Sequence, residues 1–258
     1  MSVRETIEAI IRQAGEIILA AKKPEVFEKD GHANFVTQTD MDAQTFLIDR
    51  LHRAFPEAEF LAEEKENEAL SDRLTFIIDP IDGTTNFMHG RNWSCIAVAL
   101  TVEREVRMAF VYQPWEEDMY FAEKGGGAYC NGAPIHVSDI PLDQGLIIFG
   151  TSPYNLSLCR RSMALCAAFI QRAVDVRRLG SAELELCDVA AGRAEAFWEL
   201  ELKPWDYAAG SLILTEAGGR VSRTDGQPLR QGEKTGVLAG NPRCFEAALE
   251  VMTSVGAD

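Results

Sequence analysis

The chain has 258 residues and a hydrophobic content of 47%, enough for one large core or two closely joined lobes. Its formal net charge of −15 argues against nonspecific binding to nucleic acid and to anionic membrane surfaces. No apolar run is long enough to span a bilayer, and the N-terminus has no signal-peptide pattern. We therefore expect a cytoplasmic globular protein with neither a membrane nor a nucleic-acid partner.

Two helices are predicted in the first 54 residues. Residues 1–23 have apolar side chains at helical spacing, and residues 41–54 read as a second helix that Thr39 or Asp40 starts. The buried stripe predicted for the first helix consists of Ile7, Ile10, Ile11, Ala14, Ile17, Ile18 and Ala21.

An apolar strand that begins at Phe60 is predicted to end in two acids, Glu63 and Glu64. Charged residues continue to Glu68, and such runs are usually solvated. Only Glu63 and Glu64 are close enough to the strand end to point into a site.

The stretch FIIDPIDGTTNFMH, residues 76–89, places Asp79 and Asp82 three residues apart at the end of a buried strand. Pro80 holds Asp79 extended and interrupts regular strand pairing. Gly83 permits a tight turn, and a helix that starts at Thr84 would present unpaired N–H groups to an anion. The stretch can therefore offer carboxylates to a divalent cation and backbone donors to a phosphate. An ordinary acidic turn is the competing interpretation, because the motif is short.

The middle of the chain predicts strands and one helix. Three apolar or alternating segments separated by short turns indicate an antiparallel meander. The triple glycine that follows is interpreted as a turn, because it lacks the lysine and helix of a phosphate-binding loop. The predicted segments are strands 95–102, 107–112, 119–122 and 146–151, a helix over 157–173, and a soft boundary over 141–145.

A second acidic motif, KPWDYAAGSLILTEAGG, occupies residues 203–219 and predicts one helix. Pro204 suits the first turn, and Gly218 with Gly219 ends the helix. Asp206 lies in the first turn, where the helix dipole favours a carboxylate. A helix cap is therefore the competing interpretation to a metal ligand.

The six cysteines form no C-x-x-C pair, and most lie in apolar surroundings. We expect buried free thiols in a reducing compartment rather than disulfides or a zinc site.

Taken together and in this order, the motifs resemble the inositol monophosphatase family of magnesium-dependent, lithium-sensitive sugar phosphatases. The resemblance covers nearly the whole chain and includes NFVTQTD (34–40), the paired glutamates, IIDPIDGTTNF (77–87), LGSAELELCDVAAGRAEAFWE (179–199) and PWDYAAGSLILTEAGG (204–219). It implies an α+β fold, a layered α-β-α-β-α sandwich in a single domain over residues 1–258. The metal site would lie where two lobes meet, at about 1–143 and 144–258. It also implies a homodimer.

The resemblance implies a role for each matching residue. The metal ligands would be Glu63, Asp79, Asp82, Asp206 and the backbone carbonyl of Ile81. Gly83 and Thr84 would bind phosphate, while Asp40 and Thr84, with Glu63, would prepare the attacking water. The alcohol half of the substrate would contact Gly180, Ser181, Ala182, Glu199 and Asp206, with Glu64 and Lys29 as supporting groups. Ala62 and Ser181 depart from the glycine and threonine that are commoner in relatives.

The ligand types explain the expected cofactor. Hard oxygen ligands without histidine or thiolate favour Mg²⁺ over Zn²⁺. The four carboxylates carry about four negative charges, which two Mg²⁺ would balance, and the number in use is two or three. The expected activity is a phosphomonoesterase that hydrolyses a small phosphorylated polyol, first of all myo-inositol 1-phosphate, by direct attack of a metal-activated water. Asp206 would act at the leaving oxygen.

Two alternatives stay open. Relatives of the same superfamily act on fructose 1,6-bisphosphate, NADP or nucleotide bisphosphates, although Glu199 and the sequence Thr85-Asn86-Phe87 resemble the inositol-phosphate branch. The other alternative is a catalytically idle relative that serves as a regulatory or binding partner. The presence of every expected ligand favours the enzyme.

Overall fold

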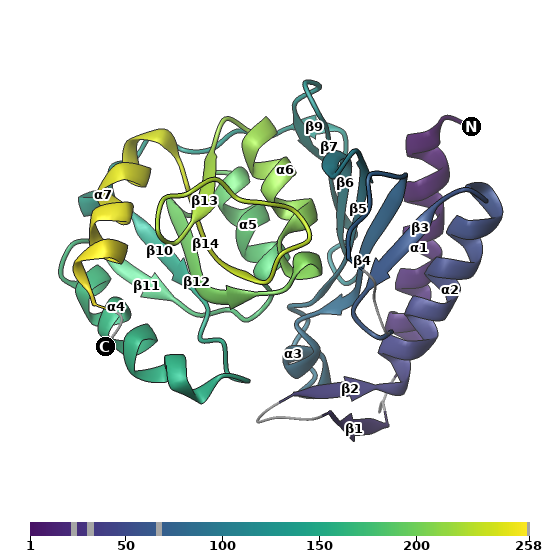
Figure 1. Ribbon diagram of the computed structural model, residues 1–258, viewed down its shortest axis with the longest axis horizontal. Helices are drawn as coiled ribbons and strands as arrows, with labels where there is room; N and C mark the ends of the chain where they lie inside the picture. The colour runs from purple at the N-terminus through teal and green to yellow at the C-terminus, as the bar shows by residue number, and fades with distance from the viewer. Residues whose placement is uncertain (22–24, 30–33, 66–68, 257–258) are drawn as a thin grey trace.

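The computed structural model describes residues 1–21, 25–29, 34–65 and 69–256. Figure 1 shows five layers, in which two sheets alternate with three pairs of helices. The predicted α-β-α-β-α sandwich is therefore confirmed. The helices are α1 (Val3–Ala20) and α2 (Gln38–Ala54) on one outer side, α5 (Ala182–Ala190) and α6 (Ala208–Glu216) between the sheets, α4 (Cys159–Ile170) and α7 (Pro242–Ser254) on the other outer side, and the short α3 (Thr84–Met88).

The larger sheet has the strand order β3-β4-β5-β6-β7-β8-β9. Its first pair is parallel and all later pairs are antiparallel, so the predicted meander is confirmed. The strands are β3 (Glu59–Ala62), β4 (Thr75–Asp82), β5 (Cys95–Val102), β6 (Glu105–Gln113), β7 (Asp118–Glu123), β8 (Ala128–Cys130) and β9 (Ala133–Pro134).

The smaller sheet has the order β11-β10-β12-β14-β13. β10 is parallel to both of its neighbours, whereas β14 is antiparallel to β12 and β13. A two-stranded ribbon of β1 (Val26–Glu28) and β2 (Phe35–Thr37) precedes α2. The strands of the smaller sheet are β10 (Leu146–Phe149), β11 (Asp175–Arg177), β12 (Ala196–Leu202), β13 (Arg220–Arg223) and β14 (Thr235–Gly240).

The apolar stripe of α1 packs as predicted, with two exceptions. Ile7, Ile10, Ile11, Ala14 and Ile18 are buried, but Ile17 is only half-buried, and Ala21 is half-buried and follows the end of the helix. The helix ends at Ala20, and Lys22 and Lys23 of the predicted segment lie outside the described residues.

The start of α2 differs from the prediction. The helix begins at Gln38, and Thr37 is its N-cap, whereas Thr39 or Asp40 was expected to start it. Asp40 is the third residue of the helix, and its carboxylate accepts a hydrogen bond from the backbone N–H of Thr37 at 2.9 Å. This reciprocal capping box satisfies two backbone donors at once and so moves the start three residues earlier than Met41.

The second acidic motif is also divided in a way that the sequence did not predict. Pro204–Asp206 forms a 3-10 turn, η3, and α6 begins only at Ala208. Tyr207 separates them with φ −142°, which is not helical, so Asp206 lies before α6 rather than in its first turn.

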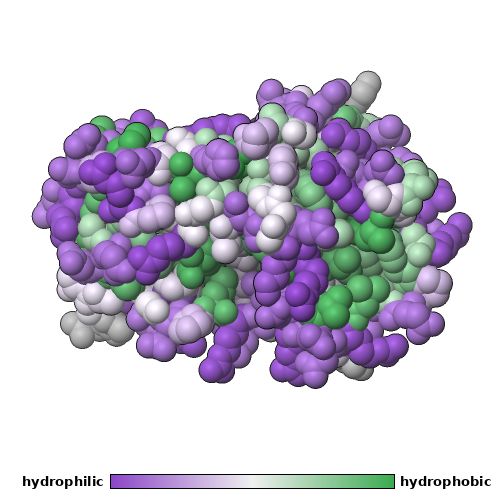
Figure 2. Space-filling model, turned by 90° about the horizontal axis from the view of Figure 1, so that it is seen from above, coloured by the Kyte–Doolittle hydropathy of each residue, from purple (hydrophilic) through white to green (hydrophobic). Residues whose placement is uncertain are grey.

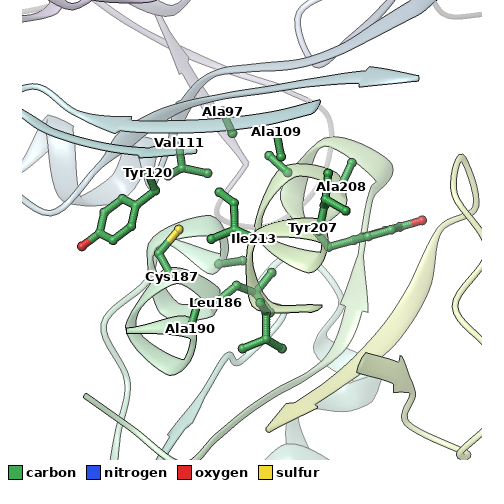
Figure 3. Packing of buried hydrophobic residues seen from close by; sticks show 14 of the residues in the cluster. Ala97, Ala109, Val111, Tyr120, Leu186, Cys187, Ala190, Tyr207, Ala208 and Ile213 are labelled. Carbon is green, nitrogen blue, oxygen red and sulfur yellow. The ribbon is translucent and has the colours of Figure 1, made fainter. Parts of the chain in front are cut away.

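Each helix layer has its own apolar contacts. One cluster joins α1 and α2 to the larger sheet, and another joins α4 and α7 to the smaller one. Figure 3 shows the central cluster, where Ile213 of α6 and Leu186 of α5 pack below the alanines and Val111 of the larger sheet. Small residues such as Ala97 and Ala109 on this face let the helices approach closely.

The face drawn in Figure 2 is largely hydrophilic, with hydrophobic residues visible between polar ones. Among the described helices, none has the length and apolar character that a membrane crossing requires. All six cysteines are free, but burial was predicted too broadly, because Cys159 at the start of α4 is exposed and Cys130 and Cys166 are half-buried.

Candidate active site

A cavity with acidic walls opens between the half of the chain that forms the larger sheet and the half that forms the smaller one. Its lining comes from β4 and α3 on one side and from segments near β10, α5 and β12 on the other. The predicted metal-binding carboxylates all reach this cavity. The lining residues are Asn34, Phe35, Glu63, Asp79, Ile81, Asp82, Gly83, Thr84, Thr85, Gly150, Pro153, Tyr154, Arg178, Gly180, Ala182, Glu185, Glu199, Leu202 and Asp206.

The end of β4 positions Asp79 and Asp82. The strand is buried along its whole length and includes both aspartates, since it continues to Asp82. An irregularity in its pairing with β5 lies between Asp79 and Asp82 and accommodates Pro80, which has no N–H for the ladder. The Ile81 N–H donates to Asp79 Oδ1 at 2.9 Å, which orients that carboxylate.

Asp82 is held by the beginning of α5. Its Oδ2 accepts hydrogen bonds from Ser181 Oγ at 2.7 Å and from the Glu183 N–H at 2.7 Å. The Ser181 hydroxyl is thus directed at a carboxylate, and only 1% of the residue is exposed, whereas the sequence placed Ser181 against substrate. Cys95 Sγ lies 3.8 Å from the same Oδ2.

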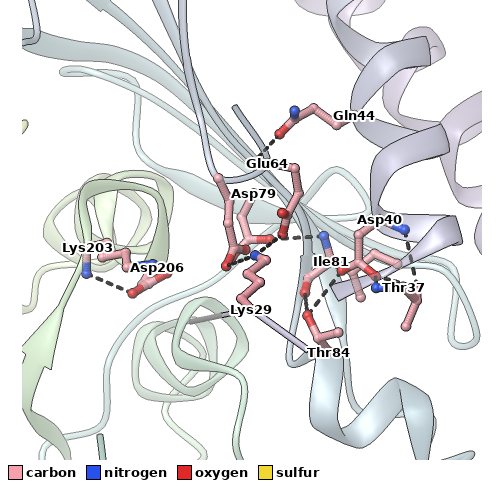
Figure 4. A network of polar contacts seen from close by, with 11 residues as sticks. Lys29, Thr37, Asp40, Gln44, Glu64, Asp79, Ile81, Thr84, Lys203 and Asp206 are labelled. Carbon is pink, nitrogen blue, oxygen red and sulfur yellow. Dashed lines mark hydrogen bonds and ion pairs between the residues drawn. The ribbon is translucent and has the colours of Figure 1, made fainter. Parts of the chain in front are cut away.

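Asp206 reaches the cavity from η3. Its Oδ2 accepts a hydrogen bond from the Lys203 N–H at 2.7 Å, which closes the 3-10 turn (Figure 4). Asp206 therefore both caps this turn and lines the cavity.

Glu63 and Glu64 share one lysine. Lys29 Nζ lies 3.3 Å from Glu63 Oε1. It also pairs with Glu64 Oε1, as Figure 4 shows. The Glu64 N–H donates to Gln44 Oε1 on α2 at 2.8 Å. The predicted supporting groups, Lys29 and Glu64, are thus in contact with the proposed ligand Glu63.

Asp40 and Thr84 form a hydrogen-bonded pair, although they are 44 positions apart in the sequence (Figure 4). Thr84 Oγ1 lies 3.1 Å from Asp40 Oδ1 and 3.0 Å from the carbonyl oxygen of Ile81. Burial raises the pKa of Asp40 to about 6, against hydrogen bonds from Thr37 that lower it.

The opposite wall contains Glu199 on β12, with 6% of the residue exposed. Its Oε1 accepts hydrogen bonds from the Ser152 N–H at 2.7 Å and from Ser152 Oγ at 3.2 Å. Gly180, which was also predicted, has φ +90°, and its N–H donates to Glu185 Oε1 at 2.8 Å. Only a glycine adopts this conformation without strain.

The carboxylates raise one another's pKa values. Burial, followed by Glu63 and then Asp82, raises the pKa of Asp79 well above its usual range. Burial and then Glu63 do the same for Asp206. Burial also raises the pKa of Asp82 to about 6, against the hydrogen bond from Ser181. A cation among these groups would relieve both the burial of charge and the repulsion.

The donor set fits a hard divalent ion, since the described residues that line the cavity include several carboxylates and Ile81 but no histidine or cysteine. In their present conformations, no three acidic, histidine or cysteine side chains of the described residues converge closely enough to hold an ion. In these conformations each carboxylate contacts a donor of the protein: Asp79 the Ile81 N–H, Asp82 the Ser181 hydroxyl, Asp206 the Lys203 N–H and Glu63 the Lys29 ammonium.

Nine of the described lining residues were not predicted from the sequence, and four of them lie beside Glu199 or order the loop before α5. Glu185 orders the loop before α5, and Tyr154, Arg178 and Gly150 line the wall beside Glu199. Glu185 lies within the quoted motif 179–199. An acidic residue among the apolar residues of a helix does not reveal from sequence that its side chain will accept hydrogen bonds from a loop. The other three lie outside every quoted motif.

Comparison with known proteins gives one consistent result. The model of the inositol monophosphatase family matches residues 1–255. Inositol monophosphatase 1 of Bos taurus is 34% identical over 246 residues, which cover 91% of this chain and 88% of that protein. Nus factor SuhB of Escherichia coli (strain K12) is 34% identical over 247 residues, with 93% and 92% covered.

A solved structure agrees with the sequence relatives. The extragenic suppressor protein suhB from Bartonella henselae has a TM-score of 0.91 to this chain and is 30% identical. The match covers 98% of each chain, so the five layers and the connections between them are shared along the whole length.

Proposed function

The chain belongs to the inositol monophosphatase family, and from this we propose that it is a Mg²⁺-dependent phosphomonoesterase whose first candidate substrate is myo-inositol 1-phosphate. The observation that carries the proposal is one cavity that joins four acidic side chains to the Asp40–Thr84 pair. Every role that phosphate ester hydrolysis by water requires is filled there by a described residue.

The residues proposed to hold Mg²⁺ are Glu63, Asp79, Asp82, Asp206 and the carbonyl of Ile81. When bound, two or three such ions supply the positive charge that offsets these carboxylates and stabilises the charge on the attacking and leaving oxygens. Ser181 and the Glu183 N–H keep Asp82 oriented, and Lys29 supports Glu63 and Glu64.

Thr84 and Asp40 are proposed to orient the attacking water. The Thr84 hydroxyl has a single proton, and ionised Asp40 accepts it in a hydrogen bond. The lone pairs of Thr84 Oγ1 then accept a hydrogen bond from a water, which turns a lone pair of that water toward phosphorus. The backbone N–H groups of Gly83 and Thr84 are proposed to bind the phosphate oxygens.

The other wall is proposed to hold the alcohol half. Glu199 can accept hydrogen bonds from sugar hydroxyls, and Gly180 and Ala182 line the same wall. Attack forms a P–O bond to the water oxygen and breaks the ester P–O bond. The attacking water loses one proton, and the leaving oxygen gains one through a water that Asp206 positions, so the products are the free polyol and hydrogen phosphate.

The proposal has alternatives in the substrate and in the role of the protein. Fructose 1,6-bisphosphate, NADP and nucleotide bisphosphates are alternative substrates, because contacts to the phosphate and a few hydroxyls dominate such a pocket. Relatives that carry the name Nus factor SuhB keep open a binding or regulatory role, with or without catalysis. A homodimer, a cytoplasmic location and the absence of a nucleic-acid partner stay predictions, and the net charge of −15 supports the last of them.

The test is phosphate release from inositol 1-phosphate with and without Mg²⁺, with Asp206→Asn as the matched variant. We expect Mg²⁺-dependent release that the variant lowers by orders of magnitude, because an amide cannot replace the carboxylate charge. Thermal unfolding of both proteins shows whether the variant folds. Equal turnover by the variant and the natural protein would refute the role of Asp206, and no release from any of the candidate substrates would favour the idle relative.

A further inference from the structure

Arg178 is the one cation among the described residues that line the cavity. Six carboxylates share this lining: Glu63, Asp79, Asp82, Glu185, Glu199 and Asp206. Lys29 lies nearby, but Glu63 and Glu64 already neutralise it. Within the described lining, an anionic part of a substrate that is not held at the acidic end therefore meets the positive side chain of Arg178.

The backbone brings Arg178 to the cavity wall. The residue follows β11 directly and precedes Gly180, in the loop that leads to α5. A Cβ atom on Gly180 would lie 3.0 Å from Arg178 Cζ, so the guanidinium rests against the glycine Cα. Because Gly180 itself lines the cavity, this contact holds the guanidinium at the wall.

The guanidinium lies on the side of the cavity proposed for the alcohol half. Burial raises the pKa of Glu199 to about 7, and the charge of Arg178 opposes that rise. The two side chains nevertheless form no ion pair within 4 Å, which leaves space between them. Arg178 is not among the leading influences on Asp79, Asp82 or Asp206, so its charge acts mainly at the wall of Glu199.

Arg178 is also unpaired, in contrast to its neighbour. Arg177 pairs with Asp175 and donates to the carbonyl oxygen of Val176 at 2.8 Å. Arg178 is exposed, and within the described part of the chain it has neither a hydrogen bond nor an ion pair. Its five N–H donors are thus available to a ligand, and a guanidinium binds phosphate through two parallel hydrogen bonds.

We propose that Arg178 forms a second anion subsite, which binds the phosphate group of a substrate that is not hydrolysed. The inference rests on the proposed phosphatase function and narrows its substrate class. The second phosphate belongs either to a sugar bisphosphate or to a dinucleotide. A polyol monophosphate has no group for this subsite and gains nothing from it.

The test compares Arg178→Gln with Arg177→Gln, which removes a neighbouring arginine that does not line the cavity. For each protein, kcat and KM are measured with inositol 1-phosphate, fructose 1,6-bisphosphate and NADP. We expect Arg178→Gln to lower kcat/KM by about 10- to 100-fold for the substrates with a second phosphate, mostly through KM, as loss of one charge-assisted contact predicts. Inositol 1-phosphate should change by less than about twofold, and Arg177→Gln should change none of them.

The two substrates with a second phosphate identify its source. A loss confined to fructose 1,6-bisphosphate supports a sugar bisphosphate, and a loss confined to NADP supports a dinucleotide. Arg178→Lys retains the charge without the two-pronged geometry, so it should recover part of the affinity. If turnover of either substrate is too slow to measure, its competitive inhibition of inositol 1-phosphate hydrolysis replaces KM.

Three results would overturn the subsite. An equal loss for all three substrates would place Arg178 at the reacting phosphate or in support of the fold. An unchanged KM and inhibition constant for both substrates with a second phosphate would show that no subsite exists. Equal losses for Arg177→Gln and Arg178→Gln, with normal thermal unfolding, would show that the position of Arg178 at the cavity is not what the ligand recognises. Failure of the proposed function is a separate outcome, since the natural protein would then release no phosphate from any substrate.

Discussion

Most hydrogen bonds to the carboxylates of the cavity come from hydroxyl and backbone N–H groups rather than from cationic side chains. Asp82 accepts from a hydroxyl and a backbone N–H, Asp206 accepts from a backbone N–H, and Glu199 accepts from Ser152 twice. These bonds orient the side chains but do not cancel their charge. The free energy of burying these carboxylates therefore depends on their protonation and on bound cations.

The stability of the variant Glu199→Gln, measured against pH, tests how strongly the cavity opposes ionisation of Glu199. The pKa of Glu199 is raised from 4.5 to about 7 in the folded protein, so the folded state binds more protons between these values. Its ionisation lowers the free energy of unfolding as pH rises through that window. The variant lacks this penalty, so its stability relative to the natural protein should increase from pH 4.5 to 7, by on the order of 3 kcal/mol at most.

Urea unfolding of both proteins at several pH values measures the difference. A constant difference across the window would mean that Glu199 ionises freely in the folded protein. Because hydrogen bonds lost to the amide act equally at every pH, they shift the whole curve and do not change its slope.

At the scale of elements, Glu183 connects the two central helices. Its N–H on α5 donates to Asp82, and its carboxylate accepts from the N–H groups of Ala209 and Gly210 at the start of α6. Helix α6 has no side-chain cap of its own, so a residue of another helix performs that function. The link joins the carboxylate at the end of β4 to the helix that follows Asp206.

Glu183→Ala should lower the free energy of unfolding by about 2 to 4 kcal/mol, because Glu183 is fully buried and two backbone donors would lose their acceptor. Glu216→Ala is the matched control. Glu216 also accepts from two N–H groups, those of Gly125 and Gly127, but it is half-buried, so water can replace it at a cost below about 1 kcal/mol. If urea unfolding gave equal losses of unfolding free energy for both variants, the hydrogen bonds from Glu183 to α6 would contribute no more to stability than those of Glu216.

At the scale of the whole molecule, the cavity brings carboxylates of two halves together. Glu63, Asp79 and Asp82 come from one half and Asp206 from the other. In the unfolded chain these residues lie up to 143 positions apart, as the difference between 206 and 63 shows. A cation that binds all of them can therefore bind only the folded protein.

Mg²⁺ should accordingly raise the thermal unfolding midpoint. At about 100 times the dissociation constant, the gain in the free energy of unfolding would be about 2.7 kcal/mol per site. Asp206→Asn should respond less, and NaCl at matched ionic strength controls for screening. A midpoint that stays the same over the whole range of Mg²⁺ concentrations would contradict the proposed ligand set.

Much of the fold could be predicted because its signals are local. Helical spacing indicated α1, alternating and apolar runs indicated the meander, and the order of the acidic motifs indicated the family and its five layers. Boundaries were less accurate. Thr37 rather than Thr39 caps α2, and α6 begins two residues after Asp206, because capping contacts and the neighbouring helix decide where a helix starts.

The sequence by itself determined which residues carry the candidate chemistry, since Asp79, Asp82 and Gly83 depend on a strand, a proline and a turn within a few positions. Tertiary structure decided what each side chain meets. Ser181 donates to Asp82 across 99 positions, and Arg178 rests on the cavity wall beside Glu199. The burial that raises the pKa values of Asp79, Asp82 and Asp206 depends on the folded packing, because the dielectric surroundings of a group are set by its neighbours in space.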